Sequence, residues 1–224
     1  MVPSGGRLVS DRTERQGAGA FGFSRVPDVQ QLCERSSQLM YPELAFDDRM
    51  YEALVEVVRC LPDDRWGHSI VAVAHCVFGT SRDALTSIST RDWPDAEDQV
   101  LAGIRACHDV NAARAYLDLM DQPTVNEDWR STSRFLHLVN PGVFPIWNDR
   151  IALHFGLAGH RDVNSGHAYR SWLAFASDAV ERHERLIQQS VQRHLVINVP
   201  PIRAVSLLLS WFGPIPSDEP ANLP

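Results

Sequence analysis

The spacing of apolar residues restricts the fold of this chain more than any other feature, because almost every apolar pattern repeats with the period of an α-helix. Met50, Leu54, Val57, Val58 and Leu61 recur at helical intervals. Residues 66–78 are apolar nearly all round, which predicts a central buried helix. Only the segment HLVINVP, residues 194–200, is compatible with a strand. The sequence predicts an all-α fold, a compact bundle of about eight to ten helices.

The clearest single helix is expected near the end of the chain. Pro201 suits the first turn of a helix, an apolar face runs from Ile202 to Phe212, and Gly213 with Pro214 are stop signals. Residues 1–26 and 214–224 lack periodicity and are predicted to be flexible tails around an all-α globular domain, residues 27–213. The start of the chain has no apolar core of a secretory signal, and no apolar run approaches the ~18 residues of a membrane span. We therefore expect a cytoplasmic protein without a membrane partner.

The kinds and the balance of charged residues argue against several classes of function. All 21 basic residues are arginine, which excludes chemistry that requires a lysine Schiff base or a P-loop lysine. The net charge of −7 argues against a strong, general nucleic-acid binder. Residues 130–161, however, contain four arginines and one aspartate, and form a basic segment in an acidic chain.

The sequence predicts no metal site and no cofactor. The four cysteines, Cys33, Cys60, Cys76 and Cys107, are widely separated, which argues against zinc, iron–sulfur and disulfide frameworks. The histidines form no HExxH motif, and no G-x-S-x-G nucleophile elbow is present.

The stretch RSTSRFLHLVNPGVFPIWNDRI, residues 130–151, concentrates the residues with chemical potential. It predicts a helix with Arg130, Arg134 and His137 along one edge, a Pro-Gly turn, an apolar connection, and a second helix opened by Asn148 or Asp149. This stretch resembles the region of helix-hairpin-helix DNA glycosylases, in particular the adenine-mismatch type, in which a helix is followed by FPI and by a catalytic aspartate that opens the next helix.

The resemblance implies two helical subdomains, residues 62–156 and residues 27–61 plus 157–213, with the site in the cleft between them. Alignment on Phe144, Pro145 and Ile146 places the catalytic position on Asn148, whereas alignment on Arg130, Ser131 and Thr132 places it on Asp149. Ser131 or Arg130 fills the position at which bifunctional members carry a catalytic lysine, so the implied activity is monofunctional.

The chemistry that this resemblance implies is base excision from DNA. A carboxylate fixed at a helix start stabilises the positive charge that develops on the sugar as an N-glycosidic bond breaks. The base must first leave the stack and enter a pocket. Candidate substrate contacts are Trp147, His137 and Ser131, and candidate phosphate contacts are Arg130, Arg134 and Arg150.

Structural interpretations of the same residues remain open. Asn148 is a favourable N-cap, Asp149 suits the first turn of any helix, and Trp147 after FPI suits a core anchor.

An alternative function also remains open. The loop at residues 123–128, which has the place of the family's hairpin, has no glycine and contains two acids, and this favours the alternative. In that alternative the chain is a non-catalytic nucleic-acid or protein interaction module that retains the glycosylase-like helical fold.

Overall fold

The computed structural model describes residues 22–37, 45–61, 66–79, 87–88, 99–120, 122–195 and 197–212. Regular structure in these ranges is helical, and the β pairing found there is one isolated bridge between Ile88 and Val125. The predicted all-α fold is confirmed. The described helices are α2 (Val29–Ser36), α3 (Ala45–Arg59), α4 (Trp66–Gly79), α5 (Val100–Ala106), α6 (Val110–Asp118), α7 (Trp129–Val139), α8 (Asp149–His154), α9 (His160–Val163), α10 (Gly166–Gln192) and α11 (Pro201–Trp211).

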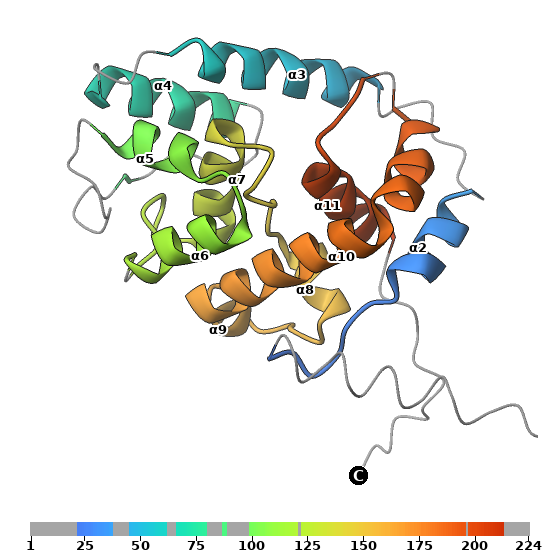
Figure 1. The fold of residues 1–224 in the computed structure, drawn as a ribbon. Helices are drawn as coiled ribbons and strands as arrows, with labels where there is room; N and C mark the ends of the chain where they lie inside the picture. Colours follow the sequence, from blue (N-terminus) through green and yellow to red (C-terminus); the bar gives the residue numbers. More distant parts are fainter. Residues whose placement is uncertain are drawn as a thin grey trace, which may run out of the picture.

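The helices form two packed groups that share an extensive core (Figure 1). In one group α10 packs against α11 and α2, and α8 packs against α11. In the other group α3 and α4 lie side by side and cover α7, which also contacts α5. Contacts of α10 with α7 join the groups, and α6 also packs against α10, so the long α10 connects the two halves of the molecule.

Side chains at the helix starts explain where several helices begin. Asp28, Asp109, Asp128, Asn148 and Ser165 each accept a hydrogen bond from a backbone N–H in the first turn of the helix that follows. These bonds satisfy amides that have no partner within the helix. Helix α11 instead begins with Pro201 in its first turn, as the sequence predicts.

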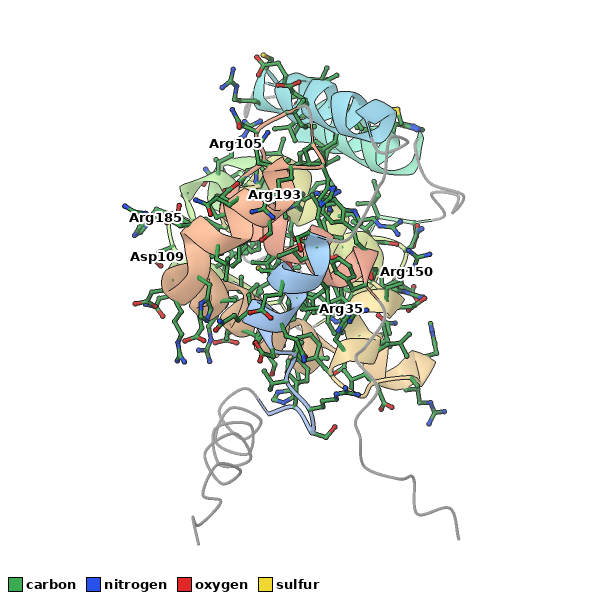
Figure 2. The ribbon with its side chains drawn as sticks, turned by 90° about the vertical axis from the view of Figure 1, so that its right-hand side faces the viewer. Arg35, Arg105, Asp109, Arg150, Arg185 and Arg193 are labelled. Carbon is green, nitrogen blue, oxygen red and sulfur yellow. The ribbon has the colours of Figure 1, made fainter. Side chains whose placement is uncertain are left out.

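Cationic and imidazole side chains satisfy carbonyls at three helix ends. Arg105 donates to Val58 O (2.7 Å) and Leu61 O (3.1 Å) at the end of α3, and lies beside that helix in Figure 2. Arg170 donates to Leu117 O and to Met120 O (3.1 Å) at the end of α6. His154 contacts Leu209 O (2.9 Å) and Phe212 O (2.8 Å) at the end of α11 through Nε2. A guanidinium or imidazole N–H in this position interacts favourably with the negative end of the helix dipole.

Two local predictions are wrong. Helix α4 packs against α7, α3 and α5 at the edge of the molecule (Figure 1), and its Val71 is 46% exposed, so it is not a central helix. The segment 194–200 forms no strand in its described residues. Glutamine amides of α10 take up its carbonyls instead: Gln192 donates to Leu195 O (3.3 Å) and Ile197 O (3.2 Å), and Gln188 to Val199 O (3.0 Å).

The packed chain also extends beyond the predicted boundaries. Phe23, which belongs to the segment predicted to be a tail, is buried and stacks on Phe155 with ring centroids 4.2 Å apart. Residues 1–21 and 213–224, which include most of both predicted tails, lie outside the described residues. Helix α3, assigned from the sequence to the terminal subdomain, packs against α4 and α7. Within the described ranges no helix is long and apolar enough to span a bilayer.

Candidate functional site

A polar cavity of about 370 Å³ lies where the loop before α7 meets the starts of α7, α8 and α9. Its lining residues are Asn126, Glu127, Asp128, Arg130, Ser131, Arg134, Asn148, Asp149, His160 and Asn164. They come from both sides of the subdomain boundary that the sequence predicts between residues 156 and 157. The cavity therefore brings together five of the eight predicted site residues: Asn148, Asp149, Ser131, Arg130 and Arg134.

Asp149 is the most accessible of the predicted catalytic groups. It is the first residue of α8, and its side chain is 66% exposed. Arg130 Nη1 donates to both carboxylate oxygens, at 3.0 Å to Oδ1 and 3.1 Å to Oδ2. A carboxylate offers about four lone-pair positions, so this contact leaves acceptor capacity for a water or a ligand.

Arg130 is held from its other side by Asp128. Its Nε donates to Asp128 Oδ1 at 2.9 Å, and its side chain is 28% exposed. Burial alone would lower the pKa of Arg130, but the hydrogen bonds and charges of Asp128 and Asp149 raise it above its ordinary value. Arg130 therefore links two carboxylates, of which only Asp149 is exposed.

Asp128 itself is fixed by the start of α7. Its Oδ2 accepts hydrogen bonds from the Ser131 backbone N–H and from Ser131 Oγ, both at 3.1 Å. Ser131 is 4% exposed, so its hydroxyl is committed to this cap. An aspartate immediately before the first helical residue is a sequence signal of a helix start, which our site prediction did not use.

Asn148 caps α8 and also ties it to α11. Its Oδ1 accepts from Ile151 N–H at 2.9 Å, and its Nδ2 donates to Ser210 Oγ at 3.2 Å. Both ends of the amide are thus used structurally. The sequence predicts that either Asn148 or Asp149 opens this helix. In the structure Asn148 is the N-cap, and Asp149 is the first helical residue.

The loop that closes the cavity before α7 contains two consecutive residues with positive φ, Asn126 (53°) and Glu127 (51°). Residues other than glycine rarely adopt this conformation. Asn164 stabilises it from α9's end: its Nδ2 donates to Glu127 O (3.0 Å), and its Oδ1 accepts from Trp129 N–H (2.7 Å). Asn126 also pairs with the backbone of Ser87 through its N–H and its Oδ1.

The structure does not bring Trp147 to the cavity. The indole is fully buried against Phe155 and Trp172, and its Nε1 donates to Val163 O at 2.7 Å. Its backbone N–H donates to Ser133 Oγ at 2.9 Å. Trp147 thus has the position of a core anchor, and it fixes the chain immediately before Asn148.

His137 is buried as well. Its Nδ1 lies 2.6 Å from Phe144 O, and its Nε2 lies 2.8 Å from the Tyr51 hydroxyl. Burial, assisted by the positive charge of Arg203, lowers the pKa of His137 to about 3. Both ring nitrogens have partners away from the cavity, so His137 cannot contact a ligand there without breaking this network.

The three arginines predicted as phosphate contacts take two different positions. Arg134 lines the cavity together with Arg130. Arg150 is exposed at the outside of the molecule, as Figure 2 shows, and its Nη1 donates to Ser210 O at 3.3 Å. Arg150 does not line the cavity, and it contributes to the contact between α8 and α11.

Several cavity residues were not predicted from the sequence. Asp128 carries a cap signal, but Asn164 and His160 lie far along the chain and have no local pattern that points to α7. Among the described residues no cluster of three or more histidine, cysteine, aspartate or glutamate side chains could hold a metal ion.

The arrangement provides three carboxylates, of which Glu127 and Asp149 are exposed, two guanidinium groups and several amides around a small polar space. Such a site can accept hydrogen bonds from sugar hydroxyls or a water, and it can stabilise a positive charge next to Asp149. Comparison of the chain with protein-family models, with curated proteins and with solved structures found no match.

Proposed function

We propose that this protein is a monofunctional N-glycosidic hydrolase that removes a damaged or modified base from DNA, with Asp149 as the working carboxylate. One observation carries the proposal: an exposed carboxylate borders a cavity within the ~300–1,000 Å³ range of small-molecule sites. Cleavage of the bond between base and sugar builds positive charge on the sugar. Asp149 stabilises that charge and orients the attacking water.

The residues around Asp149 suit different parts of this reaction. Arg134 can bind a phosphate oxygen beside the extruded nucleotide. The sequence contains no lysine side chain that could form a Schiff base with the sugar. Base removal without strand cleavage is therefore the expected product.

The experiment measures alkali-labile sites in single- and double-stranded DNA that carries a panel of damaged bases. Wild type is expected to produce such sites on at least one substrate, and Asp149→Asn should lower the rate by ~10²- to 10⁴-fold. Asp162→Asn, which changes an exposed aspartate of α9 that does not line the cavity, is the matched control and should retain the activity. A wild-type protein without activity on the whole panel would contradict the proposal.

A second candidate is the non-catalytic nucleic-acid or protein interaction module. The contact of Arg130 with both Asp149 oxygens favours it, because the acid already has a partner. Among the described residues of the lining, His160 alone carries a ring, and this favours the second candidate too, since aromatic side chains commonly stack on an extruded base. Salt-dependent retention of labelled DNA by wild type and Asp149→Asn alike, without base release, would support this candidate.

A further inference from the structure

We propose that Arg130 is the positioning residue for Asp149, and that Asp128 holds Arg130 in place for this task. The inference rests on the proposed function, because it assigns a role in the reaction of the same cavity. The observation behind it is the continuous chain of contacts from Asp128 Oδ1 through Arg130 Nε and Nη1 to both oxygens of Asp149.

Asp128, the first residue in this series of contacts, is held firmly in place. Asp128 is 16% exposed, and one of its oxygens is fixed by two hydrogen bonds from Ser131 within the first turn of α7. Helix α7 has eleven residues and packs against α3, α4, α5 and α10. The position of Asp128 is therefore set by the core, and not by the cavity.

Arg130 transmits this position because its guanidinium is planar. A guanidinium that forms hydrogen bonds through both Nε and Nη1 has little rotational freedom. A lysine ammonium, with its single nitrogen, would remain free to rotate. Asp149, by contrast, is 66% exposed and would otherwise sample several rotamers. The contact with Arg130 selects one carboxylate orientation next to the cavity.

Two other arginine–aspartate pairs of the described residues lie outside the lining of this cavity. Arg170 pairs with Asp118 at 2.9 Å with similar exposures, but its Nη2 serves the carbonyls at the end of α6. Arg182 and Asp178 form a pair one turn apart on α10. The pair of Arg130 and Asp149 joins two different helices, and both residues line the same polar space.

A positioning role predicts specific kinetics under single-turnover conditions. Arg130→Gln is expected to lower the rate of base release by about 10²-fold, because a misplaced catalytic group typically costs this much. The DNA concentration for half-saturation should change by less than about threefold. Loss of a contact that only binds DNA would raise this concentration and leave the rate unchanged. Arg130→Lys should recover only part of the rate, and Asp128→Asn, which keeps a good N-cap, should also lower it. Arg182→Gln is the control and should leave the rate unchanged.

The double variant separates positioning from direct action. If Arg130 acts through Asp149, Arg130→Gln combined with Asp149→Asn should be no slower than Asp149→Asn alone. Additive losses in the double variant, or an effect of Arg130→Gln on half-saturation alone, would overturn the inference and make Arg130 a direct substrate contact.

Side-chain nitrogen NMR tests the same contacts without any activity. In wild type the Arg130 guanidinium should show slowed rotation about its Nε–Cζ bond, and this restraint should be lost in Asp149→Asn and in Asp128→Asn. Free rotation in wild type would overturn the inference. A restrained guanidinium in a protein that releases no base would refute the proposed hydrolysis, while it would keep the link between Arg130 and Asp149.

Discussion

His137 of α7 contacts Tyr51 of α3 and has a defined tautomer. Phe144 O can only accept, so Nδ1 carries the proton and Nε2 accepts from the Tyr51 hydroxyl. Arg203 lies over the Tyr51 ring, 5.0 Å from its centroid, and disfavours a second positive charge here. The neutral ring is therefore part of the packed interior. His137 has a structural role, although the sequence places it on the same helix edge as Arg130 and Arg134.

The neutral state of His137 predicts a loss of stability in acid. Folded His137 binds a proton only near pH 3, whereas an unfolded histidine binds one near pH 6.5. Between these values the unfolded state binds more protons, so the free energy of unfolding falls as the pH falls. From pH 6.5 to 5.0 this histidine should contribute a loss of about 2 kcal/mol. Urea unfolding of wild type and His137→Asn at both pH values measures the difference, and equal pH dependence in the two proteins would show that His137 is not the cause.

At the scale of elements, helix α8 is attached to α11 at both of its ends. Asn148 contacts Ser210 at the start of α8, and His154 contacts the last carbonyls of α11 from its end. The buried Trp147 fixes the chain just before the helix. A six-residue helix has little stability alone, so tertiary contacts determine the direction in which Asp149 leaves the backbone.

Substitution of the cap tests this attachment. Asn148→Ala removes the bond to Ile151 N–H and the bond to Ser210, and should lower the free energy of unfolding by about 1 kcal/mol. Asn148→Asp keeps an N-cap acceptor and should cost less than about 0.5 kcal/mol. Urea unfolding at neutral pH distinguishes the two variants. Faster base release by Asn148→Asp than by wild type would place the catalytic position at residue 148, as the alignment on Phe144, Pro145 and Ile146 does.

The sequence predicts this element better than its surroundings. The helix starting at Asn148 and Asp149, and the two arginines next to the site, follow from residue order within one short stretch. The partners of His137 and Trp147 do not, because Tyr51, Val163 and Arg203 reach them through tertiary packing. Apolar periodicity places a residue on the buried face of its helix, but it does not state which helix covers that face. The outer side of α4 illustrates this limit, because its apolar residues predicted a central helix.

At the scale of the whole molecule, one buried cluster extends through both groups of helices. It includes Leu32 of α2, Ile104 of α5, Leu136 of α7, Trp172 of α10 and Leu208 of α11. Helices α6 and α7 share this core with α10, so neither group can unfold without exposing apolar surface of the other. The two subdomains predicted from the resemblance are therefore expected to depend on each other for stability.

This shared core predicts a single cooperative transition. Tryptophan fluorescence reports on all six tryptophans, of which Trp129, Trp147 and Trp172 are buried, whereas far-ultraviolet circular dichroism reports on the helix content of the backbone, including α3 and α4. The two signals should give the same urea midpoint and the same slope. Separate midpoints would mean that α3 and α4 unfold independently of the core around α10.

The guanidinium groups that hold the ends of α3 and α6 also determine which cellular modifications can reach these positions. Acetyl and ubiquityl groups are transferred to lysine side chains, and the sequence has none. Arginine also keeps its proton at every physiological pH. Lysine-directed acetylation or ubiquitylation therefore leaves the hydrogen bonds of Arg105 and Arg170 to the terminal carbonyls intact.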